Sequence, residues 1–206
     1  PSPSYLRKQL RLEEKFVILG PATKWLDSSR KHYLKEFASR LKENEVLLLF
    51  GCDEDNIKVP KGVQLYGFTH NREELAQLYS MADVFANCSY EESLSLINVE
   101  CQACGTPVVT FDNTGMSETV DGISGLRVQS GDYGELLNSC REIVSLDNEE
   151  LKNIRISFIK KRFDFPVGAW YNHFVFTENK NERRRADARR YNAGQCAPGA
   201  AALCTA

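Results

Sequence analysis

The sequence NCSYEESLSLINVECQACGTPVVT, residues 87–110, contains the pattern that decides the fold. It begins at the end of an apolar segment, continues through a polar loop, and reaches a helix expected over residues 94–104. Gly105 follows at a position where a glycine commonly ends a helix, and residues 107–111 form the apolar run of a buried strand. Two strands joined through a helix favour a parallel pair, because parallel strands need a long crossover connection.

The same alternation of apolar runs and amphipathic segments extends over most of the chain. Apolar runs predict further strands over residues 15–19, 46–50, 63–66, 84–86 and 125–128. Helical spacing predicts further helices from Asp27 or Ser28 to about Leu41 and over residues 72–81, 133–145 and 148–162. This order predicts an α/β fold with a Rossmann-like, doubly wound parallel sheet.

Ligands of such sheets bind beyond the carboxyl ends of the strands. The loops expected at that edge begin at Gly20, Gly51, Gly67, Asn87 and Asp112. The first of them reads Gly-Pro-Ala-Thr-Lys, so it carries neither the Gly-x-Gly-x-x-Gly dinucleotide signature nor a Gly-x-x-x-x-Gly-Lys phosphate loop. A dinucleotide cofactor is therefore not the predicted ligand.

The composition divides the chain of 206 residues into three segments. Residues 1–13 are polar and predict a linker, residues 14–176 predict the folded domain, and residues 177–206 predict a poorly ordered tail. The tail holds six basic and three acidic residues before a run rich in Ala, Gly and Cys. The net charge of the chain is −2, which argues against a nucleic-acid partner, and no apolar run approaches the ~20 residues of a membrane span.

The seven cysteines are scattered through apolar segments. We interpret them as reduced, packed residues of a cytoplasmic chain rather than as a disulfide framework. Cys101 and Cys104 form one Cys-x-x-Cys pair, but no second pair accompanies it at zinc-ligand spacing. Helix packing is therefore favoured over a metal or redox role, and no metal site is predicted.

Two glutamates flank the start of the predicted helix. Glu92 precedes it and Glu100 lies about two turns inside it, so both carboxylates can face one cavity above the sheet. The unpaired backbone N–H groups expected at the helix start belong to Ser93, Leu94, Ser95 and Leu96. Two carboxylates beside such an anion site suit a nucleotide-sugar, which carries both hydroxyls and phosphates. Spacing alone equally allows a solvated loop glutamate and an ordinary helix-surface glutamate.

Several segments in fixed order resemble the retaining family-4, group 1 glycosyltransferases. Glu92-x7-Glu100 followed by CGTPVV at residues 104–109 is similar to their donor-site signature. LYSMADVF at 78–85 and TGMSETV at 114–120 resemble the segments that flank it, and the agreement covers about residues 14–146. The chain departs from the family at Ser93 and Ser95, where the family usually has glycine.

The resemblance implies the two-domain GT-B fold, of which this chain would be the carboxyl-terminal, donor-binding half. It implies that Glu92 contacts hydroxyls of the donor sugar and acts in catalysis, and that Glu100 contacts the ribose hydroxyls. Main-chain atoms of Gly67, Phe68 and Thr69 would contact the base. A basic residue would hold the donor diphosphate, with Lys31 the best match and Arg30 and Lys24 as alternatives. No metal and no other cofactor is implied.

The implied reaction is transfer of a sugar from a nucleotide-sugar to a hydroxyl acceptor with retained configuration, in bacterial polysaccharide or glycan synthesis. The acceptor would be a glycan or a lipid-linked molecule bound through an amino-terminal domain that this chain lacks. Residues 163–176 would pack on that domain, and the full enzyme would lie in the cytoplasm, with peripheral association at the inner face of the membrane. Two alternatives stay open: a truncated, non-catalytic module that binds a nucleotide or a partner protein, and a nucleotide-sugar epimerase of the same architecture.

Overall fold

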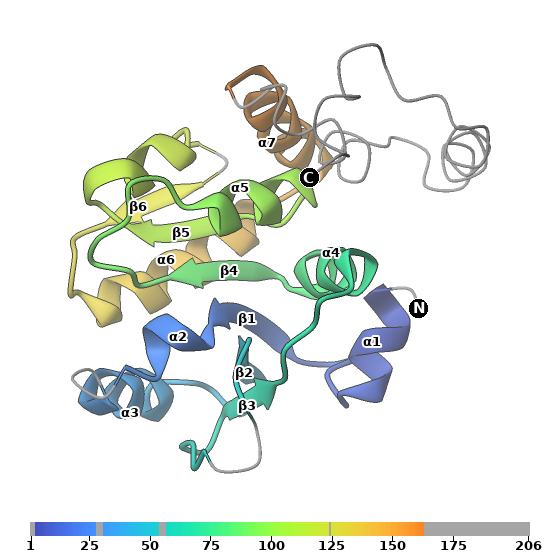
Figure 1. Cartoon of the computed structure of the whole chain (residues 1–206), viewed down its shortest axis with the longest axis vertical. Helices are drawn as coiled ribbons and strands as arrows, with labels where there is room; N and C mark the ends of the chain where they lie inside the picture. The colour runs from blue at the N-terminus through green and yellow to red at the C-terminus, as the bar shows by residue number, and fades with distance from the viewer. Residues whose placement is uncertain (1–2, 28–30, 54–56, 124, 163–206) are drawn as a thin grey trace, which may run out of the picture. The chain divides into compact units, whose positions relative to one another are not determined.

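The computed structural model describes residues 3–27, 31–53, 57–123 and 125–162. Its centre is a six-stranded sheet in the order β3-β2-β1-β4-β5-β6 (Figure 1). The strands are β1 (Phe16–Pro21), β2 (Glu45–Phe50), β3 (Val63–Tyr66), β4 (Val84–Asn87), β5 (Val108–Phe111) and β6 (Leu126–Val128). Every neighbouring pair is parallel, which confirms the predicted Rossmann-like α/β fold.

Helices cover both faces of the sheet. They are α1 (Pro3–Gln9), α2 (Ala22–Trp25), α3 (Lys31–Ser39), α4 (Arg72–Met81), α5 (Leu96–Ala103), α6 (Tyr133–Leu146) and α7 (Glu149–Arg162), with the 3-10 helix η3 (Thr114–Thr119) after β5. One buried apolar cluster joins one face of the sheet to α2, α3 and α6, and a second joins the other face to α1, α4 and α5. Ile18 faces the first cluster while its neighbours Val17 and Leu19 face the second, as the period of a strand requires.

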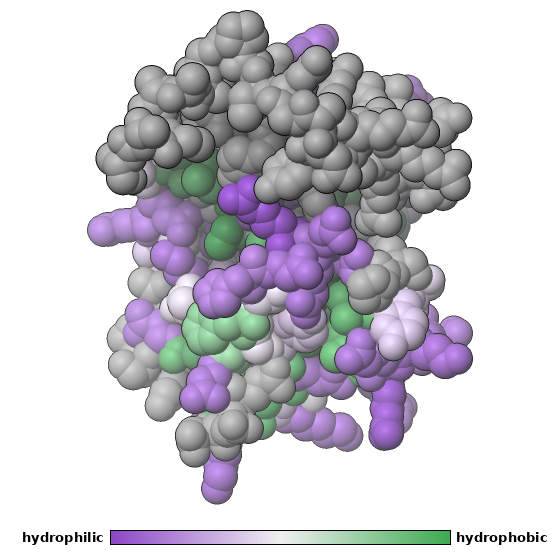
Figure 2. Space-filling view, turned by 45° about the vertical axis from the view of Figure 1, so that its right-hand side comes forward, coloured by the Kyte–Doolittle hydropathy of each residue, from purple (hydrophilic) through white to green (hydrophobic). Residues whose placement is uncertain are grey.

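The apolar side chains are largely enclosed between these layers. Figure 2 shows hydrophilic side chains over much of the described surface on one face, with smaller hydrophobic areas between them. The five cysteines among the described residues are not in disulfides, and four of them, Cys52, Cys88, Cys101 and Cys140, are buried. In the described part of the chain, no helix is both long and apolar enough to cross a membrane.

The structure corrects the prediction of a linker over residues 1–13. Residues 3–9 form α1, and Leu6 and Leu12 are almost fully buried in the cluster that α4 also enters. Arg7 fixes this packing, because its Nε donates to the carbonyl of Met81 at 2.7 Å and its Nη2 pairs with Asp83 at 2.8 Å. The polar composition concealed the helix, since Leu6 is the only buried side chain among its described residues.

Other differences concern the ends of elements. The short helix α2 directly follows β1 and was not predicted, and α5 begins at Leu96 rather than at residue 94. The predicted caps at residues 27 and 28 precede α3, which begins at Lys31, and residues 28–30 lie outside the described residues. The predictions for residues 163–176 and for the tail, 177–206, also lie outside them.

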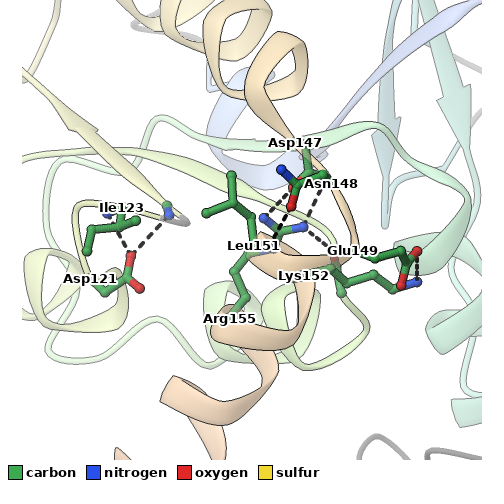
Figure 3. A network of polar contacts seen from close by, with 10 residues as sticks. Asp121, Ile123, Asp147, Asn148, Glu149, Leu151, Lys152 and Arg155 are labelled. Carbon is green, nitrogen blue, oxygen red and sulfur yellow. Dashed lines mark hydrogen bonds and ion pairs between the residues drawn. The ribbon is translucent and has the colours of Figure 1, made fainter.

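Helix α7 is anchored through a buried arginine. Arg155 is fully buried, and its guanidinium pairs with both carboxylate oxygens of Asp147 at 2.7 and 3.0 Å. Figure 3 shows Arg155 beside Asp147. The same guanidinium donates to the carbonyl of Gly105 at 2.7 Å, which ties α7 to the turn between α5 and β5. This turn contains the CGTP sequence, so the anchor lies at the amino edge of the sheet.

Candidate functional site

The strand order reverses between β1 and β4, which are neighbours in the sheet although they are far apart in sequence. In open α/β sheets such a switch point leaves a crevice beyond the carboxyl ends of the two strands. The segments that follow these two strands are α2 and residues 88–95. The sequence-predicted candidates Lys24 and Glu92 lie on them, one on each side of the switch point.

Lys24 and Glu92 form an ion pair across this point. The distance from Lys24 Nζ to Glu92 Oε1 is 3.0 Å, and the two side chains are 30% and 20% exposed. The pair is therefore half-buried but open to a ligand. In the sequence, β2, β3 and α4 lie between Lys24 and Glu92. The sequence pattern therefore could not predict that these two residues are in contact.

The neighbouring residue, Trp25, fixes the position of Lys24. Its side chain is buried, and its indole N–H donates to the carbonyl of Ala86 in β4 at 3.2 Å. The indole lies where a Cβ of Gly20 would stand, so a glycine is needed there for this close approach. The short helix after β1 is thus held against β4, which carries the chain toward Glu92.

The start of α5 lies after the loop that carries Glu92. Val99 N–H donates to the carbonyl of Ser95, so the backbone N–H groups of Leu96, Ile97 and Asn98 have no partner within the helix. The sequence predicted these N–H groups at residues 93–96, whereas the structure places them at residues 96–98. Ser93 and Leu94 precede the helix and are exposed, whereas Ser95 is buried.

A buried polar network supports this helix start from below. Asn87 Nδ2 donates to Ser95 Oγ at 3.0 Å and to Asn98 Oδ1 at 2.9 Å, and Asn98 Nδ2 donates to Thr119 Oγ1 at 2.9 Å. All four side chains are buried. Sequence reasoning named Ser95 as a candidate but missed its partners Asn87, Asn98 and Thr119, although a buried asparagine at the end of an apolar strand is itself a signal that a polar partner exists.

The η3 segment approaches the Glu92 loop closely. Gly115 N–H donates to the carbonyl of Glu92 at 3.1 Å, and a Cβ on Gly115 would overlap the carbonyl of Ser93. Only glycine allows this approach, which explains why the TGMSETV segment accompanies the Glu92 motif. The loop that bears Glu92 is therefore fixed from two sides.

Glu100 makes a different set of contacts from Glu92. It lies further along α5, and its Oε2 accepts a hydrogen bond from the Tyr79 hydroxyl of α4 at 2.8 Å. Burial raises the pKa of the Glu100 carboxyl above its usual range, and the hydrogen bond from Tyr79 lowers it in part. The carboxylate is thus an acceptor already oriented by one donor.

The candidate base site lies in the loop after β3. Phe68 is 69% exposed, while Thr69 Oγ1 donates to Glu74 Oε2 at 2.8 Å. The Tyr66 hydroxyl donates to the other oxygen of Glu74, and these two hydrogen bonds lower the pKa of that carboxyl. Gly51 N–H donates to the carbonyl of Tyr66 at 3.0 Å, so the loops after β2 and β3 lie together at the same edge as Lys24.

The structure does not describe the side chains of the remaining basic candidates. Lys31 begins α3 and its side chain is not described, and Arg30 lies outside the described residues. Among residues with described positions, no group of three or more His, Cys, Asp or Glu side chains could hold a metal ion. The described residues therefore bring one lysine and one carboxylate into contact, with a second carboxylate on α5 and an exposed aromatic ring in the loop after β3.

The sequence profile of the family described as glycosyl transferases group 1 matches residues 13–145, more than half of the chain. This chain belongs to the group 1 glycosyltransferases. The matched region contains the Lys24–Glu92 pair, the whole of α5 and the Tyr79–Glu100 hydrogen bond. The resemblance carried by Glu92-x7-Glu100 and CGTPVV is thereby confirmed at the level of the family.

Similar curated proteins share a shorter part of the sequence. The D-inositol 3-phosphate glycosyltransferase of Mycolicibacterium vanbaalenii is 39% identical over 87 residues, which are 42% of this chain and 19% of that protein. The protein of the same description in Mycolicibacterium smegmatis is 44% identical over 80 residues, 38% of this chain and 18% of that protein. The match thus spans less than a fifth of the length of these relatives.

Several solved structures share the fold. HepE of Anabaena in complex with UDP-glucose has a TM-score of 0.65 and 23% identity, over 78% of this chain and 48% of that one. A glycosyltransferase from Rickettsia africae has a TM-score of 0.60 and 18% identity, over 94% of this chain and 52% of that one. This group 1 glycosyltransferase chain therefore corresponds to about half of each of these structures.

Proposed function

We propose that this chain is the donor-binding half of a retaining glycosyltransferase that transfers a sugar from a nucleotide-sugar to a hydroxyl acceptor. The observation that carries the proposal is the Lys24–Glu92 ion pair across the switch point, beside the start of α5. A cation and an acidic acceptor meet there, and the loop that carries Glu92 leads into the start of α5, in a member of the group 1 family.

Lys24 takes the role of the cation that holds the donor diphosphate, in place of Lys31, the best match by resemblance. The 3.0 Å contact with Glu92 places the Lys24 ammonium at the switch point, where a diphosphate can bind to it and to the N–H groups at the start of α5. When the glycosidic bond breaks, negative charge grows on the diphosphate, and a fixed cation there stabilises that charge.

Glu92 takes the role of the acceptor for hydroxyls of the donor sugar. A diphosphate that displaces Glu92 from Lys24 would leave the carboxylate beside the sugar, where the transition state has oxocarbenium character. Glu100 would accept hydrogen bonds from the ribose hydroxyls, and main-chain atoms of residues 67–69 would contact the base. The complexes of HepE with UDP and with UDP-glucose support uridine nucleotides as the first ligands to test.

In the whole protein, this domain would supply the donor sugar for transfer. The acceptor would be a glycan or a lipid-linked molecule held by a second domain, in polysaccharide or glycan synthesis. The site would work in the cytoplasm, at the inner face of the membrane when the acceptor is lipid-linked. No metal or organic cofactor enters the proposed reaction, because the cation at the diphosphate is Lys24.

Calorimetry of the purified chain with UDP, GDP and UDP-glucose tests the proposal. We expect binding in the micromolar-to-millimolar range, about −4 to −8 kcal/mol. Sugar transfer by the 206-residue chain should stay near background. Absence of binding to all three ligands at millimolar concentration would contradict the donor-binding role. Robust transfer would instead show that a second domain is not needed for the acceptor.

The main competitor is a non-catalytic module that binds a nucleotide or a partner protein. Both functions predict UDP binding, but only the transferase predicts that the sugar adds to affinity through Glu92. Glu92→Gln therefore separates them. It should weaken UDP-glucose relative to UDP in a transferase and should change both ligands alike in a simple nucleotide-binding module.

A further inference from the structure

Tyr79 is a buried residue of α4 with a hydroxyl that reaches the candidate site. Its side chain is only 3% exposed, and the hydroxyl donates to Glu100 Oε2 at 2.8 Å. The Phe50 ring at the carboxyl end of β2 packs edge-on against the Tyr79 ring, with 5.8 Å between the ring centroids. The aromatic ring thus lies between a strand end and the helix that bears Glu100.

The backbone of Tyr79 is fixed as well. Thr106 Oγ1 donates to the Tyr79 carbonyl at 2.7 Å, and both groups are buried. Thr106 belongs to the CGTP turn, which Arg155 in turn holds through Gly105 at 2.7 Å. A chain of hydrogen bonds therefore runs from the anchored turn through Tyr79 to the carboxylate of Glu100.

We propose that Tyr79 is a positioning residue of the donor site: its hydroxyl orients the Glu100 carboxylate to accept hydrogen bonds from the ribose hydroxyls of the nucleotide. This inference rests on the proposed donor-binding function. A carboxylate has acceptor sites on both oxygens, so a donor on Oε2 leaves Oε1 and the remaining lone pairs for a vicinal diol. A carboxylate already fixed by one donor loses less conformational entropy when the diol binds.

The electrostatics of the pair support this role. Burial raises the pKa of Glu100, and the hydrogen bond from Tyr79 acts in the opposite direction, so it favours the ionised form that accepts from hydroxyls. The other titratable groups that act on this pair are the thiols of Cys101, on α5, and of Cys104, the residue after it. Burial raises the pKa of Cys101 well above its usual range, so that thiol stays neutral between pH 5 and pH 8.

The test compares UDP with 2′,3′-dideoxy-UDP, which lacks both ribose hydroxyls, in the wild type and in Tyr79→Phe. The substitution keeps the ring and removes only the hydroxyl. We expect UDP affinity to fall about three- to tenfold, as for one lost hydrogen bond. Affinity for the dideoxy nucleotide should be unchanged. The loss of UDP binding on acidification should begin at higher pH in Tyr79→Phe, because the group that lowers the Glu100 pKa is gone.

A purely structural role of Tyr79 predicts a different result. Both nucleotides would then weaken by the same factor, and the pH profile would keep its midpoint. Tyr133→Phe is the matched control, because Tyr133 is also a buried tyrosine and its hydroxyl is hydrogen-bonded to Cys88 and Tyr90 instead. It should leave the ratio of UDP to dideoxy-UDP affinity unchanged. In a Glu100→Gln background, Tyr79→Phe should not lower that ratio further.

The outcomes separate this inference from the proposed function. If the wild type binds none of UDP, GDP and UDP-glucose, both are wrong. If it binds UDP and Tyr79→Phe keeps the wild-type ratio of the two affinities, the positioning role is overturned and the donor-binding role stands. A measurement on the wild type covers the case in which Tyr79→Phe does not fold: the 13C chemical shift of Tyr79 Cζ should change on UDP binding, and a shift that does not respond overturns the proposal.

Discussion

The two edges of the sheet are held by different kinds of ion pair. At the amino edge, arginines pair with carboxylates: Arg7 with Asp83, Arg141 with Glu45 and Arg155 with Asp147. The latter two pairs are bidentate. At the carboxyl edge, across the switch point, Glu92 pairs with a lysine through one contact of 3.0 Å.

The chemistry of these side chains explains the difference. A guanidinium presents a planar fork that matches a carboxylate and stays charged when buried, so it suits a permanent anchor. An ammonium is a flexible point charge, and a half-exposed pair with it contributes at most about 1 kcal/mol. A ligand phosphate can therefore replace Glu92 on Lys24 at little cost, whereas Asp147 cannot be replaced on Arg155 without unfolding the turn.

Arg155→Ala should show the largest effect on stability. The substitution leaves Asp147 and the Gly105 carbonyl without their donor and opens a cavity, at a cost of about 3 kcal/mol or more. The melting temperature should fall by roughly 6–12 °C, which thermal melting followed by circular dichroism measures. Arg40→Ala is the control, because Arg40 pairs with Glu36 on the surface and should cost less than about 0.5 kcal/mol. Equal melting temperatures for the two variants would contradict the anchor.

Glu100→Gln should have the largest effect on ligand binding. The amide keeps the shape but loses the charged acceptor, so UDP should bind about 1–3 kcal/mol more weakly by calorimetry. Because burial raises the pKa of Glu100, the wild-type carboxylate protonates at higher pH than an ordinary glutamate. Wild-type UDP affinity should then fall on acidification through that pKa, whereas the variant should lack this component. A pH profile that the two proteins share would contradict the role of Glu100.

The same raised pKa makes a prediction for stability. A carboxyl whose pKa is raised by folding stabilises the folded state at low pH, and that contribution is lost as the pH rises through the folded-state value. At pH 7 Glu100→Gln should therefore melt slightly above the wild type, with the difference disappearing below about pH 4.5. A variant that is less stable at pH 7 would show that the ionised carboxylate has stabilising partners beyond Tyr79.

Lys24→Met should have a smaller effect than Glu100→Gln on affinity and almost none on stability. Loss of one charge-assisted contact to the diphosphate should weaken UDP by about 1.5 kcal/mol, roughly tenfold. Lys31→Met is the matched control, because Lys31 is the lysine that family resemblance favours. We expect it to bind UDP within about twofold of the wild type, a difference below 0.5 kcal/mol. A larger loss in Lys31→Met than in Lys24→Met would reverse the assignment.

Glu92→Gln should have the smallest effect on UDP affinity. Unlike the other substitutions, it should leave that affinity unchanged or raise it. Without its carboxylate partner Lys24 is released, so UDP should bind equally well or up to about 1 kcal/mol more tightly. UDP-glucose should gain nothing or weaken, because the sugar loses its acceptor. Calorimetry with both ligands measures the difference, and equal losses for both would contradict the division of roles between Glu92 and Lys24.

The sequence by itself determined the architecture and the main acidic candidates. Short apolar runs separated by amphipathic segments favour a parallel sheet, so the α/β fold and, apart from α2 and η3, the elements from β1 to α7 were predictable within a few residues. The Glu92-x7-Glu100 spacing and the CGTPVV sequence were local enough to indicate the family. The elements and both motifs consist of residues close together in the sequence. They can therefore be recognised without knowledge of the tertiary structure.

The tertiary structure decided which distant residues meet. Lys24 meets Glu92 because β1 and β4 are adjacent in the sheet, and Tyr79 meets Glu100 because α4 and α5 pack on the same face. The helix α1 was hidden for the same reason, since its one leucine, Leu6, becomes a core residue by packing in the cluster that α4 also enters. Strand order is set by long-range packing rather than by the local sequence pattern. Each of these contacts joins segments that are far apart in the sequence, so the spacing of residues along the chain does not reveal it.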